Sequence, residues 1–160
     1  MRRVGVAMVT TILIAFGAAP AFADVTGFIG ANLTPENRRL QGVAVGAGLL
    51  ILGLEVEYAK SPQDLTVLAP KLTTAMGNVL VQTPFAILGL QPYATTGAGF
   101  YRETLGTRQQ TGFVLNTGGG VKISLVGPLR LRVDYRVLKL GSGALHSPAH
   151  RVYAGLNLRF

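Results

Sequence analysis

Apolar and polar residues alternate along much of this chain with the period of two that is typical of β-strands. The clearest run lies in residues 129–139, where five apolar residues share one face: Leu129, Leu131, Val133, Tyr135 and Val137. Charged residues occupy the other face of this run: Arg130, Arg132, Asp134 and Arg136. The stretches 151–160 and 54–58 repeat the pattern. Each run predicts a strand with one apolar and one polar face.

Eight such segments can be placed along the chain, separated by turn clusters rich in Pro, Gly or polar residues. They cover residues 25–33, 42–50, 53–60, 71–83, 91–103, 112–124, 129–138 and 150–160. The connections after the first, third, fifth and seventh segments are polar and roughly 8–11 residues long, and the others are shorter, an asymmetry that is typical of outer-membrane barrels. The pattern predicts an all-β fold, an eight-stranded antiparallel up-and-down transmembrane β-barrel with both termini at the short-turn end.

The direction in which each face points is clearer for some strands than for others. In the fourth strand, one set is predicted to face outward: Thr73, Ala75, Gly77, Val79 and Val81. In the fifth strand, one face carries Tyr93, Thr95, Gly97, Gly99 and Tyr101. The pattern does not say whether this face points into the barrel or out of it.

Two solvents can explain alternating faces. A water-soluble barrel of the lipocalin type buries the apolar face, whereas a membrane barrel turns it toward lipid and encloses the polar face. Small residues are abundant on the expected inner face, at Gly46, Gly48, Gly118, Gly120 and Gly155, where they leave room for long side chains. An arginine facing lipid costs about 2–4 kcal/mol at the bilayer centre, so the arginines of the 129–138 strand are expected inside.

Opposite charges on the expected inner faces predict an ion-pair network in the lumen. Its candidate members are Glu55, Glu57, Arg130, Arg132, Asp134 and Arg136, with Glu103 as a further partner. We interpret this network as mainly structural, with the gating of solute passage as the alternative.

The first residues have the three parts of a secretory signal peptide. Met1-Arg2-Arg3 is basic, Val4–Ala19 is apolar, and Ala21-Phe22-Ala23 is a small-x-small cleavage site. The alternative, a transmembrane anchor, is disfavoured because the apolar run is shorter than the ~20 residues that a spanning helix needs. We therefore expect a signal peptide over residues 1–23 and an outer-membrane barrel domain over residues 24–160.

Composition narrows the function classes. The 15 Lys and Arg residues exceed the 7 Asp and Glu residues, which gives a formal net charge of +8. The basic residues are scattered, so no nucleic-acid partner is expected. Only 14% of residues are charged, compared with roughly 25% in soluble domains. The absence of cysteine excludes disulfides, thiolate nucleophiles and cysteine-ligated metal sites.

Candidate chemistry is sparse. His146, Ser147 and His150 lie in the last long connection, but a serine hydrolase also needs an acidic group to orient its histidine, and no acidic residue follows Asp134. The glycine-rich segments do not match a phosphate-binding loop. We expect no catalytic residues, no cofactor and no metal. Arg38, Arg39 and Arg108 are candidates for contact with anionic lipid headgroups, or are solvated loop charges.

Several segments, in order, resemble the bacterial outer-membrane β-barrel domain family, the small porin-family or OmpA/OmpX-like eight-stranded barrels. They are residues 53–60 (GLEVEYAK), 76–81 (MGNVLV), 91–101 (QPYATTGAGFY), 116–122 (NTGGGVK) and 131–136 (LRVDYR). The final strand, with Leu156, Leu158 and Phe160, is similar to the signal that the barrel-assembly machinery reads.

The resemblance implies location in the cell outer membrane, with outer-membrane lipids and the barrel-assembly machinery as partners; no other protein partner is identifiable. It implies little about activity, because this fold serves many roles. We expect a non-enzymatic, structural role in the envelope with at most narrow passage of small solutes. The alternatives are a narrow porin-type channel, an outer-membrane lipid hydrolase or an adhesin, although long external loops, the usual sign of an adhesin, are absent from the pattern.

Overall fold

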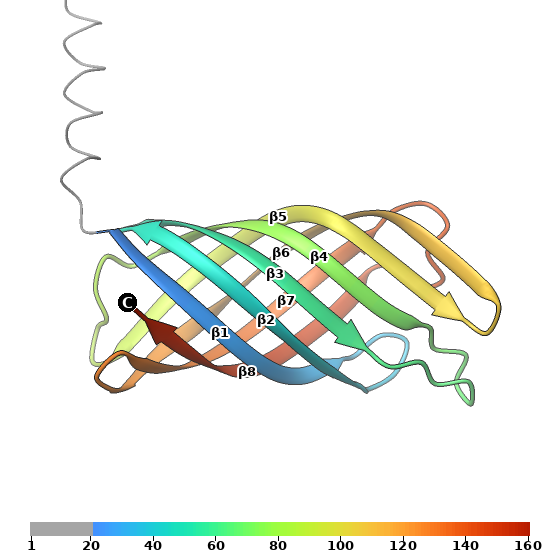
Figure 1. Cartoon of the computed structure of the whole chain (residues 1–160), viewed down its shortest axis with the longest axis horizontal. Helices are drawn as coiled ribbons and strands as arrows, with labels where there is room; N and C mark the ends of the chain where they lie inside the picture. The colour runs from blue at the N-terminus through green and yellow to red at the C-terminus, as the bar shows by residue number, and fades with distance from the viewer. Residues whose placement is uncertain (1–20) are drawn as a thin grey trace, which may run out of the picture.

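A computed structural model describes residues 21–160, which form a closed barrel of eight antiparallel strands (Figure 1). The strands are β1 (Ala21–Asn32), β2 (Arg38–Leu49), β3 (Leu52–Ser61), β4 (Lys71–Gln82), β5 (Leu90–Leu105), β6 (Arg108–Val126), β7 (Leu129–Leu140) and β8 (Ala149–Arg159). Each strand pairs with its neighbours in the sequence, and β1 pairs with β8 to close the barrel. The predicted all-β fold, an up-and-down barrel of eight antiparallel strands, and the eight predicted strands are confirmed.

The predicted signal peptide lies almost entirely outside the described residues. Its last three residues, Ala21–Ala23, are described as the beginning of β1, where Ala23 pairs with Ala47 of β2. Within residues 21–160, no helix is long and apolar enough to cross a membrane.

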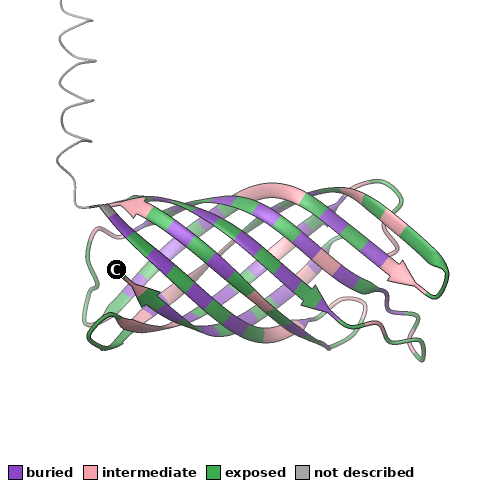
Figure 2. Cartoon of the chain, in the orientation of Figure 1, coloured by how far each residue is buried: buried purple, intermediate pink, exposed green. Residues whose placement is uncertain are grey.

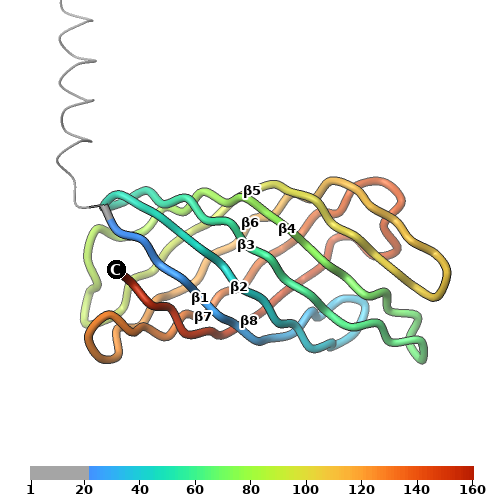
Figure 3. The backbone as a smooth tube through the Cα atoms, in the orientation of Figure 1, coloured from blue at the N-terminus to red at the C-terminus, as the bar shows by residue number. Residues whose placement is uncertain are grey.

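The connections differ between the two ends of the barrel, as the backbone trace shows (Figure 3). The end that holds the C-terminus and the beginning of β1 has the connections 50–51, 83–89 and 127–128, and we call it the turn end. The opposite end, which we call the loop end, has the connections 33–37, 62–70, 106–107 and 141–148. The C-terminus and the beginning of β1 therefore lie at the end that the even strand count predicts.

The expected length of the fifth connection is wrong. β5 and β6 continue as a paired hairpin down to Leu105 and Arg108, so only residues 106–107 form the turn. Gly106 has φ +59°, the left-handed conformation that a two-residue hairpin turn requires at this position. The polar stretch 104–111 lacks the apolar alternation that marks a strand in the sequence, but strand pairing depends on backbone groups and continues through it. The first connection, 33–37, is also shorter than expected, because β2 begins at Arg38 rather than at residue 42, whereas the connection 83–89 has the seven residues that the predicted strand bounds gave.

Exposed and buried residues alternate along the strands, and the two faces are inverted relative to a water-soluble protein (Figure 2). Aliphatic residues such as Ile29, Leu54 and Val56 are exposed on the outer wall, while charged residues point inward and are buried. The outward direction predicted for β4 is confirmed for Ala75, Gly77, Val79 and Val81. In β5, the face with undecided direction points inward, since Tyr93, Thr95 and Tyr101 are buried.

The lumen is packed with side chains that include two apolar clusters. Toward the loop end lies an apolar cluster of Leu72, Met76, Tyr101, Val114, Leu138, Leu140 and Ala149. A second cluster contains Phe28, Leu40, Ala44, Ala59 and Tyr153. The expectation of a polar interior therefore holds for only part of the barrel. An eight-stranded barrel is narrow enough for side chains to fill, so its inner face packs partly like an ordinary protein core.

Candidate functional site

The most distinctive site is a network of six buried charges in the middle of the lumen. Glu55 and Glu57 project from β3, Arg132, Asp134 and Arg136 project from β7, and Arg151 projects from β8. Strict alternation places these residues on the inner face of their strands, and all six are at most 4% exposed. Three carboxylates therefore face three guanidinium groups in a region closed to solvent.

Arg132 joins β7 to β3 and β5. Its guanidinium forms an ion pair with Glu55, and its Nη2 lies 3.0 Å from Oδ2 of Asp134. Its Nε donates to the hydroxyl of Tyr93 at 2.7 Å, and the Tyr93 hydroxyl in turn donates to Asp134. The guanidinium carbon also lies 4.9 Å from the centre of the Tyr93 ring, which adds a cation–π contact.

Arg136 contacts all three carboxylates of the network. Its nitrogen atoms lie 2.9 Å from Glu55 Oε1, 3.1 Å from Glu57 Oε2 and 3.0 Å from Asp134 Oδ1. Its Nη2 also donates to the hydroxyl of Tyr153 at 3.0 Å. This guanidinium is the centre of the network.

Arg151 completes the network from β8. Its Nη1 lies 3.0 Å from Glu57 Oε1, and its remaining nitrogens donate to Asn32 at 3.2 Å and to Thr74 at 3.3 Å. The hydroxyl of Tyr153 donates to Glu57 Oε2 at 3.1 Å. The hydrogen bonds to neutral groups help to compensate the cost of removing these charges from water.

Glycines on the inner face of β6 make room for the network. A Cβ atom at Gly120 would lie 2.6 Å from the hydroxyl oxygen of Tyr93 and 2.2 Å from the backbone oxygen of Val133. A Cβ at Gly118 would lie 2.1 Å from the backbone oxygen of Tyr135. These two positions therefore need glycine because the backbone of β7 approaches too closely for a larger residue.

A separate ion pair lies closer to the turn end. Lys122 Nζ of β6 is 2.9 Å from Asp24 Oδ2 of β1, and both side chains are buried. Beside this pair is a small cavity of about 10 Å³, lined in part by Asp24, Glu55 and Lys122. A cavity of this size holds about one water molecule, so it does not form a passage.

The structure brings together five of the six predicted network residues, namely Glu55, Glu57, Arg132, Asp134 and Arg136. Arg130 is not among them, because it lies near the turn end, half-buried, and donates to Gln91 at 2.8 Å. Glu103 is also elsewhere: it accepts a hydrogen bond from the backbone N–H of Leu145 at the loop end.

Sequence reasoning missed Arg151, the Asp24–Lys122 pair and the two tyrosines at Tyr93 and Tyr153. Strand alternation already placed Arg151 and Tyr153 on the same face of the last strand. It gave no means of knowing that this face meets Glu57, which lies on a strand that does not adjoin β8.

Two of the three residues considered as catalytic candidates, Ser147 and His150, have other partners, and His146 has a buried Nδ1 with no hydrogen-bond partner. The Ser147 hydroxyl accepts from the Leu140 N–H at 3.1 Å and donates to the Leu140 carbonyl at 3.2 Å. His150 Nδ1 lies 2.7 Å from the Tyr135 hydroxyl. Within residues 21–160, no group of three His, Asp or Glu side chains is arranged to hold a metal ion.

The residues of the expected assembly signal lie on the outer wall at the turn end. Leu156 and Leu158 point outward from β8, and Phe160 follows the strand. All three side chains are exposed to the surroundings of the barrel. Hydrogen bonds between Phe160 and Ala23 extend the β1–β8 pairing to the edge of the barrel.

A closed barrel with an apolar outer wall and a charged lumen defines an outer-membrane type of β-barrel. The solved structures with this fold include the N-terminal β-barrel domain of Pseudomonas aeruginosa OprF, with a TM-score of 0.66 and 17% identity over 87% of this chain and 97% of that one. Neisserial surface protein A matches with a TM-score of 0.57 and 17% identity, over 87% of this chain and 94% of that one.

The attachment invasion locus protein Ail of Yersinia pestis has a TM-score of 0.52 and 12% identity, over 89% of this chain and 99% of that one. No protein-family model and no curated protein matches the sequence. The chain therefore has the fold of the eight-stranded OmpA/OmpX-like outer-membrane barrels, and at these identities the likeness extends to the fold alone.

Proposed function

We propose that this protein is an integral outer-membrane barrel with a structural, non-enzymatic role in the cell envelope, and that its lumen is closed. The observation that carries the proposal is the network of three arginines and three carboxylates that fills the middle of the barrel. The apolar cluster next to it closes the loop-end half.

The outer wall supports a membrane location. Leu54 and Val56 are 67% and 68% exposed at mid-strand positions of β3, and similar residues surround the barrel. A wall of this kind would form an apolar patch far larger than soluble monomers tolerate. Closure of the sheet also pairs the backbone of every strand, which the hydrocarbon region of a bilayer requires.

The partners in this proposal are outer-membrane lipids and the barrel-assembly machinery. Export would use the leader at residues 1–23. The exposed apolar residues Leu156, Leu158 and Phe160 would be the part of β8 that the assembly machinery reads.

Two measurements test the proposal. The folded barrel should migrate faster on a gel when unheated than after boiling, and equal mobility would count against a stable barrel. In planar bilayers the protein should be electrically silent. Steady conductance of the unmodified protein would contradict a closed lumen.

A narrow channel is a second candidate, favoured by the way the charges share partners. Arg136 touches three carboxylates and Glu55 touches two arginines, so ion pairs can exchange without leaving any charge alone. If such an exchange opens the lumen, Arg132→Ala should change the conductance of a protein that already conducts. Silence in both proteins would support the closed barrel.

The non-enzymatic part of the proposal is supported by the contacts of Ser147 and His150. The Ser147 hydroxyl bridges the backbone of Leu140, and His150 pairs with Tyr135, so neither side chain is oriented toward the other as a nucleophile and its base. Turnover of phospholipid or lipid A by the purified barrel, lost in His146→Ala, would overturn it.

A further inference from the structure

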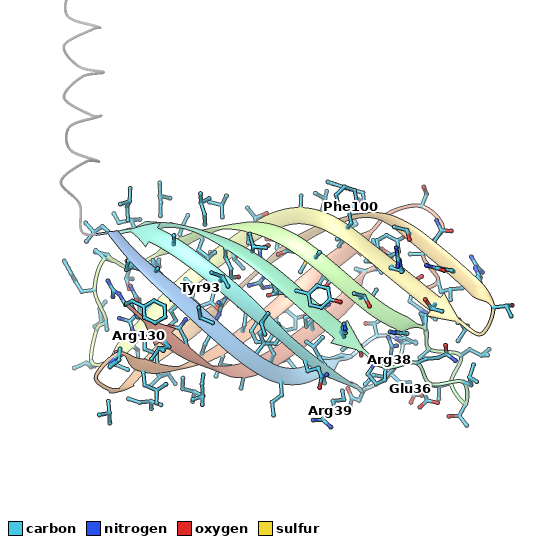
Figure 4. All side chains as sticks on the ribbon, in the orientation of Figure 1. Glu36, Arg38, Arg39, Tyr93, Phe100 and Arg130 are labelled. Atoms are coloured by element: carbon cyan, nitrogen blue, oxygen red, sulfur yellow. The ribbon has the colours of Figure 1, made fainter. Side chains whose placement is uncertain are left out.

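One stretch of the outer wall differs from the rest in shape and charge. Near the loop end, a hollow of about 320 Å³ is lined by Arg39, Gln41, Lys60, Ser61, Pro62 and Lys71. We call it the basic hollow. It lies over β2, β3 and β4, three strands that are hydrogen-bonded side by side, and Figure 4 shows Arg39 projecting from the outside of the barrel near this end.

The three cations of the basic hollow have no carboxylate partner within the described residues. Ion pairs in residues 21–160 involve other arginines and lysines, and Arg39, Lys60 and Lys71 are all exposed. Two acidic loop residues lie close along the chain: Glu36, three residues from Arg39, forms no ion pair in the described residues, and Asp64 accepts hydrogen bonds from the backbone and hydroxyl of Thr66. Glu103, on the neighbouring strand β5, is buried and faces the lumen.

The hollow lies at the boundary between the polar and apolar parts of the wall. On β3 the outward residue after Lys60, toward the membrane, is Tyr58, and Lys60 Nζ lies 5.3 Å from the centre of its ring. Tyr58 pairs laterally with Val43 and Ala75, so the wall becomes apolar within two residues. Tyrosine in such a position is typical of a membrane interface, which places the three cations at the level of lipid headgroups.

A second hollow continues the same face toward the turn end. Its volume is about 540 Å³, and its outward lining includes Val45, Ala47, Leu54, Val56, Gly77 and Val79. We call it the apolar hollow. It exists because the outward residues Ala47 and Gly77 are small while Leu54 and Val56 beside them are large.

The two hollows are about four residues apart along β3, from Lys60 to Val56, which corresponds to about 13 Å of extended strand. A cationic depression at headgroup level and an apolar depression at hydrocarbon level on one face match an amphipathic molecule with an anionic head. Arginine and lysine are the side chains that bind phosphate oxygens, arginine through two parallel N–H groups and lysine as a point charge.

We propose that the outer wall of β2–β4 binds a phosphorylated membrane lipid, with the phosphate in the basic hollow and an acyl chain in the apolar hollow. The inference rests on the proposed membrane location. It goes further in assigning one face, one lipid group and the residues that hold it: Arg39, Lys60 and Lys71.

The membrane side follows from the lengths of the connections at the two ends. The connections at the turn end have two, seven and two residues, whereas the connections 62–70 and 141–148 at the loop end have nine and eight. Outer-membrane barrels place their short turns in the periplasm and their longer loops outside. The phosphate is therefore that of an outer-leaflet lipid, and the probe that fits is diphosphoryl lipid A.

The experiment measures binding of diphosphoryl lipid A to the purified protein in neutral detergent micelles by native mass spectrometry. The test variant is Arg39→Gln/Lys60→Gln/Lys71→Gln. The matched control is Arg102→Gln/Arg108→Gln/Lys139→Gln, which removes the same charge from exposed residues near the loop end but outside the hollow, and which includes Arg108 as the other exposed candidate for headgroup contact. The test variant should lose about tenfold or more in affinity, and the control should lose much less.

A second pair of variants tests the acyl-chain part without changing charge. Gly77→Leu fills the apolar hollow, and a Cβ there meets nothing closer than 4.0 Å. Gly27→Leu is its control, because Gly27 is also exposed, has open space around it and lies on β1 outside the hollow. Gly77→Leu should weaken lipid binding, and Gly27→Leu should leave it unchanged.

Several results would overturn the inference. Dephosphorylated lipid A that binds as well as the diphosphoryl form would exclude a phosphate site. Equal losses in the two triple variants would mean a diffuse basic surface. Displacement of the lipid by millimolar inorganic phosphate would indicate a site for free anions. All variants and the unmodified protein are first tested for heat-dependent gel mobility. If the unmodified protein folds as a barrel but does not bind lipid, this inference alone is refuted. If the unmodified protein does not form a barrel, the proposed function is refuted.

Discussion

Replacing Arg136 by methionine should be among the most destabilising single changes in the barrel. The arginine contacts Glu55, Glu57 and Asp134 at 2.9–3.1 Å, and it is 0% exposed. Methionine keeps most of the side-chain volume but leaves three carboxylates facing two guanidiniums. Removing one partner from a buried ion pair costs about 3–5 kcal/mol, because the remaining charge stays buried and uncompensated. That is a large part of a typical fold stability of ~5–15 kcal/mol.

The double variant Arg136→Met/Asp134→Asn separates charge imbalance from loss of contacts. It removes one charge of each sign and leaves two pairs intact, Arg132 with Glu55 and Arg151 with Glu57. We therefore expect it to recover much of the stability that the single variant loses. Lys139→Met, at an exposed position, should stay within about 0.5 kcal/mol of the unmodified protein.

The assay is urea unfolding of the barrel in lipid vesicles, followed by far-UV circular dichroism and by the mobility of unheated samples on gels. The chain contains no tryptophan, so indole fluorescence offers no signal. A loss below about 1 kcal/mol for Arg136→Met would refute the reasoning, since it would mean that water reaches and screens the network. A double variant as unstable as the single one would show that contacts matter more than charge balance.

Three further predictions follow from individual contacts. Gly120→Val should prevent folding or destabilise the barrel by several kcal/mol, because its Cβ would lie 2.2 Å from the backbone oxygen of Val133; the measurement is heat-dependent gel mobility. Phe160→Ser should lower the amount of barrel in cell membranes while leaving refolding in detergent intact, as immunoblots and refolding yields would show. Ser147→Ala should cost about 1 kcal/mol, measured by urea unfolding, because its hydroxyl bridges the backbone of Leu140.

Each of these predictions has a control. Gly27→Val should fold normally, since nothing lies within 4 Å of a Cβ at Gly27. For Phe160→Ser, an equal loss of yield in detergent would indicate a fold defect and contradict a role in assembly. For Ser147→Ala, loss of a lipid-hydrolysing activity would contradict the purely structural role of this hydroxyl, and an unchanged urea midpoint would show that the contact with Leu140 contributes nothing.

The strand pattern was readable from the sequence because alternation records a local property. Each residue of a strand faces lipid or lumen according to its parity, that is, whether its position along the strand is odd or even. The pattern in residues 129–139 therefore predicted both the strand and the inward direction of Arg132 and Arg136. The same logic placed Gly77 and Val79 of β4 outward. Strand count, fold class and the inversion of the two faces needed nothing more, because a charge facing lipid is costly enough to decide between the two orientations.

Parity says which side a residue faces, but not which residue it meets across the lumen. Arg130 and Arg132 share a face, yet only Arg132 reaches Glu55, because the register and tilt of β7 place Arg130 at the turn end beside Gln91. Arg151 meets Glu57 although 94 residues separate them along the chain.

The sequence by itself therefore determined the barrel, its inside and its outside, since these depend on the local choice between lipid and lumen. Only the tertiary structure decided which charges meet in the network, that Leu72 and Leu138 pack as an apolar core inside a membrane barrel, and that Arg39, Lys60 and Lys71 line one hollow. Contacts of this kind depend on how eight strands are staggered around a closed circle, and that stagger is a property of the whole sheet rather than of any strand in it.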